Sequence, residues 1–281
     1  MSAELYKGLP VAQAITENLI TRCEALKLNG VNPCLAMVKL GDDEADASYE
    51  RNAEKRCEKV GITVKHFNLP EKALKSEGLD VIKQINDDDT IHACLMFRPI
   101  YDKEIENEAS KLLLAKKDVD CMTAESLASV FLGRGEGFAP CTVQACIEIL
   151  DFYGIDLTGK NVVVIGRSPV VGKPLSMMLQ NRNATVTMCH TKTLNLAEIT
   201  SKADIVLVAA GHAGVVNKNY VNDKQIIVDV GISVVDGKLC GDVDFESCEP
   251  IVKAITPVPG GVGAVTTSVL AKHVIEACER Q

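Results

Sequence analysis

NVVVIGRSPVVGKPLSMML, residues 161–179, combines a strand, a glycine turn and the start of a helix. The four β-branched residues 162–165 predict a strand that is buried on both faces, as in a parallel sheet. Gly166 and Gly172 bound the turn, and Pro174 suits the first turn of a helix, where its missing N–H is not needed. Such a turn offers free N–H groups and a positive dipole end to a phosphate. The full GxGxxG fingerprint is absent, so an ordinary strand–helix turn is the alternative.

Composition describes a globular protein and excludes several classes of function. The chain has 281 residues, 47% of them hydrophobic, which is enough for two modest domains. No apolar run is long enough to span a membrane, and the first ten residues do not resemble a signal peptide. The net charge of −8 argues against nucleic acid as a partner. The eleven cysteines form no CxxC pair or zinc pattern, so we expect no metal and reduced, buried thiols in a cytoplasmic protein.

Strands and helices alternate through both halves of the chain. The expected strands are residues 34–38, 62–67, 91–97, 162–165, 184–188, 204–210 and 225–230. The expected helices are 9–28, 47–60, 76–85, 142–153 and 267–278, and residues 234–239 predict a hairpin around Asp236-Gly237. This alternation predicts an α/β fold of two domains, each with a mostly parallel sheet, the second of them Rossmann-type. We place the domains at residues 1–143 with 264–281, and at 144–263.

Four of the predicted strands in the second domain end in residues suited to a dinucleotide. Ligands of parallel sheets lie outside the carboxyl ends of the strands. The residues expected there are 166–173, 190–192, 210–212 and 231–232, which supply glycines, hydroxyl groups and cations. The convergence of four strand ends is stronger evidence than the glycine turn alone.

Motifs along nearly the whole chain resemble the methylenetetrahydrofolate dehydrogenase/cyclohydrolase family. In the second half these are GRSPVVGKP, ATVTMCHTKT, ADIVLVAAG, IIVDVG, GDVDF and TPVPGGVG. In the first half they are Gly41-Asp42-Asp43, Tyr49, Gly61-Ile62, Lys117-Asp118-Val119-Asp120 and Pro140-Cys141-Thr142. The resemblance implies a folate-binding first domain, an NAD(P)-binding second domain and a homodimer formed through the second domain, where we expect the hairpin to be exposed.

The resemblance also implies roles for particular residues. Tyr49 and Asp120 would be the catalytic residues and would bind the folate together with Gly260 and Gly261. A carboxylate at Asp120 can accept from the amino group and the ring N–H of a pterin; a helix-capping role for Asp120 and a core role for Tyr49 are the alternatives. The nicotinamide cofactor would be held by Thr142, Gly166, Arg167, Ser168, Gly172, His190, Thr191, Ala210, Gly211, Ile232 and Thr266. For His190 we expect a role in shaping its loop rather than in chemistry.

The first domain departs from the family pattern at two polar positions. Ala53 stands where the family has a lysine four residues after the tyrosine, and Phe97 stands where it has a glutamine. Lys55 does not replace the lysine, because it lies about 120° further round the helix than Ala53. The family's PMT after GGVG is replaced by residues 264–266, Ala-Val-Thr.

These departures separate the two reactions of the family. Dehydrogenation mainly needs two oriented ligands, whereas hydrolysis of the methenyl cation needs an acid–base group. The sequence therefore predicts a dehydrogenase with weak or absent cyclohydrolase activity. We expect NADP rather than NAD, because Arg167, Thr191 and Lys192 could meet a 2′-phosphate and no acidic residue is placed for the ribose. The alternatives are a dehydrogenase of this fold acting on a non-folate substrate and an inert binding protein.

Overall fold

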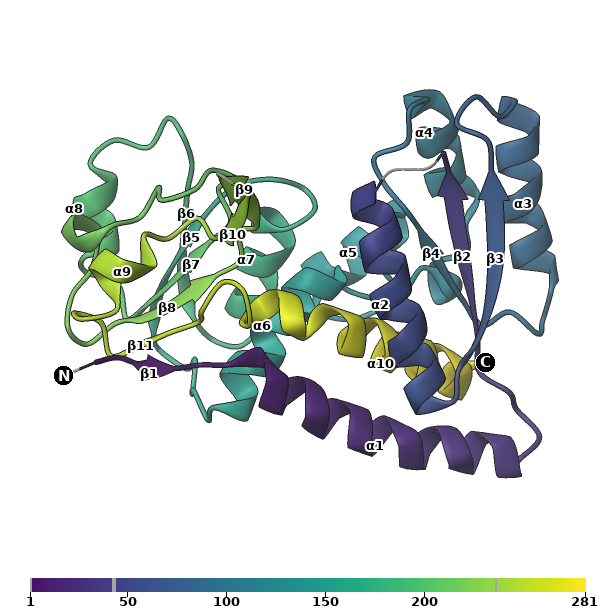
Figure 1. Ribbon diagram of the computed structural model, residues 1–281, viewed down its shortest axis with the longest axis horizontal. Helices are drawn as coiled ribbons and strands as arrows, with labels where there is room; N and C mark the ends of the chain where they lie inside the picture. The colour runs from purple at the N-terminus through teal and green to yellow at the C-terminus, as the bar shows by residue number, and fades with distance from the viewer. Residues whose placement is uncertain (1, 42–43, 236) are drawn as a thin grey trace. The chain divides into compact units, whose positions relative to one another are not determined.

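The computed structural model describes residues 2–41, 44–235 and 237–281 and divides the chain into two compact units (Figure 1). The six-stranded unit comprises Met1–Ala12 and Thr142–Thr266, and the three-stranded unit comprises Gln13–Cys141 and Thr267–Gln281. Among the described residues, no helix has both the length and the apolar character that crossing a membrane requires.

The sheet of the six-stranded unit is parallel throughout, as the run of β-branched residues predicts. Its strand order is β1-β11-β8-β7-β5-β6, and every neighbouring pair is parallel. The strands are β1 (Glu4–Leu5), β5 (Asn161–Ile165), β6 (Thr185–Cys189), β7 (Ile205–Val208), β8 (Ile226–Asp229) and β11 (Ala254–Ile255). After β5 the chain adds β6 on one side and then returns to add β7 on the other. This reversal is a topological switch point, where open α/β sheets bind ligands.

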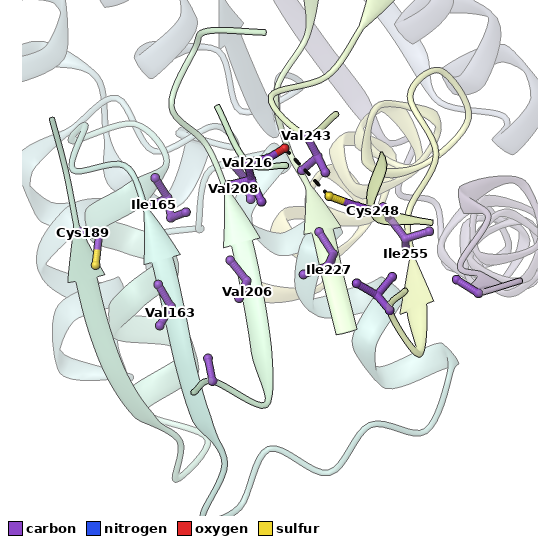
Figure 2. Packing of buried hydrophobic residues seen from close by; sticks show 13 residues of the cluster. Val163, Ile165, Cys189, Val206, Val208, Val216, Ile227, Val243, Cys248 and Ile255 are labelled. Carbon is purple, nitrogen blue, oxygen red and sulfur yellow. Dashed lines mark hydrogen bonds between the residues drawn. The ribbon is translucent and has the colours of Figure 1, made fainter. Parts of the chain in front are cut away.

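Alternate residues of these strands form a continuous core on one face of the sheet. Figure 2 shows Val163, Ile165, Val206, Val208 and Ile227 in line across β5, β7 and β8. Side chains of α8 (Leu196–Thr200) and α9 (Phe245–Cys248) pack against this cluster. The unit also contains α7 (Gly172–Gln180), η2 (Lys218–Tyr220), η3 (Val262–Ala264) and the antiparallel hairpin of β9 (Ser233–Val235) and β10 (Lys238–Cys240). A β-branched strand run thus becomes a sheet because both of its faces can be buried.

The three-stranded unit repeats the same architecture on a smaller scale. Its sheet has the order β3-β2-β4 and is parallel, with β2 (Cys34–Leu40), β3 (Thr63–Leu69) and β4 (Ala93–Met96). Residues of α3 (Lys75–Asp87) and α4 (Lys103–Leu112) share a buried cluster with β2 and β4, so these helices cover one face. The other elements are α2 (Glu44–Val60), η1 (Ala115–Lys117) and α5 (Ala124–Leu132).

Three helices contain the points at which the chain passes from one unit to the other. They are α1 (Gly8–Leu28), α6 (Cys141–Phe152) and α10 (Thr266–Arg280), with the unit boundaries after Ala12, Cys141 and Thr266. The start of the chain differs from our sequence-based boundary, which placed residues 1–143 together. Glu4 and Tyr6 donate their N–H groups to Lys253 O and Ile255 O at 3.0 and 2.9 Å, which ties β1 to β11. A two-residue strand carries no periodic signal, so the sequence did not indicate this pairing.

The sequence analysis also missed α4, α5, α8 and α9. In α4 only Ile105 and Ala109 are buried, so its apolar stripe is too sparse to stand out. The hairpin is present in the described residues, whereas its turn residue Asp236, like Asp42 and Asp43, lies outside them. Ten of the eleven cysteines are buried, with Cys240 half-buried, which confirms the expected burial.

Candidate active site

The turn after β5 can be built only with glycine at two positions. Gly166 has φ +138°, and a Cβ added there would lie 2.3 Å from the carbonyl oxygen of Ala209. A Cβ on Gly172 would lie 2.1 Å from the carbonyl oxygen of Gly166. Ser168 closes the turn, since its hydroxyl accepts the Val171 N–H at 3.0 Å. The backbone therefore comes close to itself at the start of α7, while residues 167–170 of the turn are exposed to solvent.

The strand ends around this turn are neighbours, as the sequence predicted. Gly166 N–H donates to Cys189 O at 2.9 Å, Ala209 N–H to Ile165 O at 2.7 Å, and Val230 N–H to Val208 O at 2.9 Å. These bonds continue the sheet ladder by one residue past β5, β7 and β8. The loops that follow β6, β5, β7 and β8 therefore leave one edge of the sheet in that order.

The loop after β6 presents a cation and a hydroxyl group beside the glycine turn. His190 Nδ1 accepts the N–H of Lys192 at 3.1 Å, and the His190 N–H donates to the Thr193 hydroxyl at 2.9 Å. His190 therefore shapes its own loop. The side chains of Thr191, Lys192 and Arg167 are exposed. Because β5 and β6 pair with Ile165 opposite Cys189, Arg167 and Lys192 follow adjacent strand ends, an arrangement that suits a phosphate.

Asp242 holds the loop after β7 in place, a role that the sequence analysis did not assign. Its Oδ2 accepts the N–H groups of Ala210 at 2.6 Å and Gly211 at 2.8 Å. Its Oδ1 is buried and has no hydrogen-bond partner within the part of the chain that the structure describes. A Cβ on Gly231 would lie 2.2 Å from Asp242 Cγ, so this carboxyl group packs directly on the glycine.

Asp229 is the second buried carboxyl group of this edge. It accepts N–H groups from Gly231, Asp242 and Val243, each at 3.0 Å. Burial raises the pKa of Asp229 to about 6, against the effect of these three donors and with a smaller contribution from Asp242. A Cβ on Gly241 would lie 1.8 Å from Asp229 Oδ2, which explains the glycine there. An acidic residue inside the apolar run IIVDV was the signal that could have identified this position.

The Gly- and Pro-rich segment 256–263 forms a loop in the same unit. Gly260 O accepts the Gly8 N–H at 2.8 Å, and Gly261 O accepts the Ala264 N–H at 3.1 Å. The Thr266 hydroxyl donates to Gly263 O at 3.2 Å. The Ile232 side chain is 63% exposed and lies against the same loop, 3.3 Å from a Cβ built on Gly263.

The candidate site residues are divided between the two units. All the candidates for cofactor binding, together with Gly260 and Gly261, belong to the six-stranded unit, and Thr142 is half-buried near the start of α6 there. Tyr49 and Asp120 belong to the three-stranded unit.

Within the motif KDVD, the first two residues support the fold. The buried Lys117 donates to the backbone oxygens of Ile85, Asn86 and Asp88 at 2.7, 3.1 and 2.9 Å. Asp118 accepts the N–H groups at residues 122 and 123 at 3.0 and 2.8 Å. These bonds fix the backbone on both sides of residue 120.

Asp120 keeps its carboxyl group half-buried at the start of α6. Its Oδ1 accepts the Cys141 N–H at 2.8 Å, and the N-terminus of a helix favours a negative charge. Burial nevertheless raises the pKa of Asp120, while the Cys141 N–H and the positive charge of Arg98 oppose that effect. The helix that directly follows, α5, is capped by Thr123, which accepts the Ser126 N–H at 3.1 Å. Asp120 therefore does not cap the next helix, which was the alternative interpretation.

Tyr49 lies beside the two departures from the family pattern. Its ring is 6.2 Å from that of Phe97, centroid to centroid, at an interplanar angle of 77°. Ala53 is completely buried on the same helix, α2, and Phe97 is 6% exposed. Lys55 is exposed, so it does not take the place of a lysine at position 53. Two side chains beside the tyrosine are thus apolar where the family has a lysine and a glutamine.

Comparison with known proteins agrees with both halves of the chain. Residues 6–120 match the tetrahydrofolate dehydrogenase/cyclohydrolase catalytic domain, and residues 140–281 match the NAD(P)-binding domain of that name. The bifunctional protein FolD of Clostridioides difficile is 46% identical over 280 residues, which is 99% of this chain and 97% of the relative. The FolD structure from Campylobacter jejuni matches with a TM-score of 0.94 at 36% identity, covering 99% of each chain. A FolD structure from Trypanosoma brucei, in complex with NADP and an inhibitor, has a TM-score of 0.93 at 29% identity and covers 100% of this chain and 98% of its own.

Proposed function

Because the chain belongs to the tetrahydrofolate dehydrogenase/cyclohydrolase family, we propose that it oxidises 5,10-methylenetetrahydrofolate to 5,10-methenyltetrahydrofolate with NADP in one-carbon metabolism. We further propose that it has little or no cyclohydrolase activity. The observation that carries the second part is the buried pair Ala53 and Phe97 beside Tyr49.

The residues at the edge of the six-stranded sheet fit a dinucleotide. Gly166 and Gly172 let the backbone fold tightly on itself at the start of α7, and the N–H groups at this helix start can bind a pyrophosphate. Arg167 and Lys192, with the hydroxyl of Thr191, bind the 2′-phosphate, which is why NADP is preferred over NAD. The NADP in the Trypanosoma brucei relative supports this choice. Bound NADP supplies the acceptor for a hydride from the substrate's methylene carbon.

The remaining cofactor candidates frame the nicotinamide end. Asp242 fixes the loop of Ala210 and Gly211 through two hydrogen bonds, so that this loop is rigid before the cofactor binds. Ile232, in the loop after β8, provides an exposed apolar side chain. Thr142 and Thr266, at the starts of two helices, complete the set.

The protein's part in the oxidation is to orient the folate. Asp120 accepts hydrogen bonds from the amino group and the ring N–H of the pterin. The Cys141 N–H, which also donates to Asp120, holds the carboxyl group in place. Tyr49 lies against the folate, and Gly260 and Gly261 are further folate contacts that the family resemblance implies. Loss of a hydride leaves a delocalised cation on the substrate, and no proton has to be moved by a side chain in that step.

Hydrolysis of the methenyl cation requires more than orientation. Water must lose a proton as it attacks, and general acid–base assistance contributes about 10²–10⁴-fold. Tyrosine, with an ordinary pKa near ~10, is a poor base at neutral pH. Ala53 and Phe97 are buried beside Tyr49 and provide no group that titrates.

The exposed β9–β10 hairpin bears on the oligomeric state of the protein, and its buried cysteines bear on its cellular compartment. We infer a homodimer through the six-stranded unit, because the β9–β10 hairpin exposes Val234 (68%), Val235 (48%) and Leu239 (50%). The buried thiols, with no disulfide bond among the described residues, suit a reducing compartment such as the cytoplasm.

Two assays on the purified protein test the proposal. Reduced nicotinamide should form from NADP and methylenetetrahydrofolate, and methenyltetrahydrofolate should decay at the rate measured in buffer. Absence of folate-dependent reduction with either nucleotide would refute the dehydrogenase and leave a non-folate substrate or an inert binding protein. Enzyme-dependent decay that Tyr49→Phe abolishes would refute the loss of hydrolysis.

A further inference from the structure

Arg98 lies beside Asp120 without a strong bond of its own. It follows β4, is half-buried, and its Nη2 donates to the backbone oxygen of Asp120 at 3.5 Å. Among residues 2–41, 44–235 and 237–281, this is the one hydrogen bond that the Arg98 side chain makes. A guanidinium carries five N–H donors, so most of its donors remain available.

The fold does not depend on this weak contact. A separation of 3.5 Å is longer than an ordinary N–H···O bond. The backbone around Asp120 is already fixed by the three bonds of Lys117, by Asp118 and by the Cys141 N–H. The role of Arg98 must therefore be sought in what it could bind. Its charge acts on the Asp120 carboxyl group, since it favours the ionised form against burial.

We propose that Arg98 binds the carbonyl oxygen O4 of the pterin and selects 4-oxo over 4-amino pteridines. The inference rests on the proposed function and deepens it. The edge of a pterin presents three groups in a row: the 2-amino donor, the N3–H donor and the O4 acceptor. The Asp120 carboxylate can accept from the first two, which leaves O4 next to the guanidinium. A carboxylate beside a guanidinium thus complements the whole edge, whereas a carboxylate alone would leave O4 unpaired on binding.

A comparison of two ligands distinguishes this role from a structural one. The wild-type protein, Arg98→Leu and Arg98→Lys are titrated calorimetrically with tetrahydrofolate and with 4-amino-4-deoxytetrahydrofolate, in which an amino group replaces O4 and N3 no longer carries a hydrogen. Each ligand is compared between the variants, because the change at N3 faces Asp120 in all of them alike. Loss of a hydrogen bond to a charged group predicts tetrahydrofolate binding about 10- to 100-fold weaker in Arg98→Leu. The 4-amino analogue, which cannot accept at that position, should bind Arg98→Leu as well as wild type or better. Arg98→Lys should bind tetrahydrofolate more tightly than Arg98→Leu does, since its ammonium can still donate to O4.

The kinetic readouts and the control follow from the same reasoning. Arg98→Leu should raise KM for the folate with little change in kcat and none in NADP affinity. Arg134→Leu, which removes an exposed arginine of the same unit, should match wild type with both ligands. Equal weakening of both ligands by Arg98→Leu would show that Arg98 only supports the Asp120 backbone and would overturn the proposal, as would unchanged binding of both. Arg98-dependent binding of tetrahydrofolate without turnover would refute the dehydrogenase alone, whereas a wild type that binds no tetrahydrofolate would refute both.

Discussion

Replacement of Asp120 by asparagine separates the folate-binding role of this residue from its role in the fold. The Asn side chain has the same shape and can keep an oxygen toward the Cys141 N–H, which Asp120 accepts at 2.8 Å. It replaces the other carboxylate oxygen with an amino group. Since the pterin edge offers two donors, the variant sets a donor against a donor where the wild type has a charged acceptor.

The expected magnitude follows from the bonds that change. A hydrogen bond to a charged group contributes about 1.5–3 kcal/mol. One such bond is lost in Asp120→Asn and the other loses its charge, so we expect about 3–4 kcal/mol in total. At 1.4 kcal/mol per factor of ten, folate affinity should fall about 100- to 1,000-fold. The free energy of unfolding should change little. Asn removes a negative charge that burial disfavours, as the raised pKa of Asp120 indicates, and this offsets the weaker bond to the Cys141 N–H.

The assay measures KM for methylenetetrahydrofolate and the dissociation constants of tetrahydrofolate and NADP for wild type, Asp120→Asn and Asp120→Ala. NADP binding should be unchanged in both variants. Asp120→Ala should also lose about 1 kcal/mol of stability, because the Cys141 N–H at the start of α6 loses its acceptor. If Asp120→Asn bound tetrahydrofolate within about threefold of the wild-type value, far inside the loss expected from even one charged bond, the pterin-binding role would be wrong.

Four further predictions concern other parts of the molecule. The double variant Ala53→Lys with Phe97→Gln should hydrolyse methenyltetrahydrofolate faster than the wild type, by as much as about 10²-fold. Ala53→Lys alone should not, because its buried ammonium lacks a partner. Equal gains in the single and double variants would contradict this. Asp229→Asn should lower the free energy of unfolding in urea, and the deficit should widen by up to ~3 kcal/mol between pH 7 and pH 4. The folded-state pKa of about 6 lies above the ordinary 3.8, so the wild type gains stability as pH falls through this window; a deficit independent of pH would refute the assignment. Arg167→Ala and Lys192→Ala should each raise KM for NADP about tenfold and leave NAD unaffected, and a wild-type catalytic efficiency with NAD equal to that with NADP would count against the 2′-phosphate site. Light scattering at micromolar concentration should give twice the mass of one chain, and a monomer mass would exclude the dimer through the β9–β10 hairpin.

Sequence reasoning worked best where a residue type leaves the chain few choices. The run Val162–Ile165 requires burial on both faces, and Gly166 and Gly172 stand where a Cβ would collide with the backbone. The stripe of α2 likewise placed Ala53 inside and Lys55 outside, which the structure confirms. In each case the outcome depends on local geometry that the sequence alone can indicate.

The features that the sequence analysis did not predict depend on partners far away in the sequence. Asp242 acts on Ala210 and Gly211, about thirty residues earlier, and nothing near Asp242 indicates those partners. Arg98 acquires its significance only when the chain returns with Asp120 beside it. Short elements such as β1 are held by a few backbone bonds and carry no pattern of side chains that could be recognised.

The pairing of β1 with β11 also affects how the protein is made. Strand β1 is synthesised well before its partner at Ala254–Ile255, since Ile255 follows 250 residues after Leu5. At the usual rate of about 5–20 residues per second, the first strand waits about 12–50 seconds with its edge unpaired. The three-stranded unit also waits for its segment Thr267–Gln281, which is separated from Gln13–Cys141 by residues of the other unit. Neither unit can be completed before these late segments have been made, so nascent chains of this protein should need shielding until then.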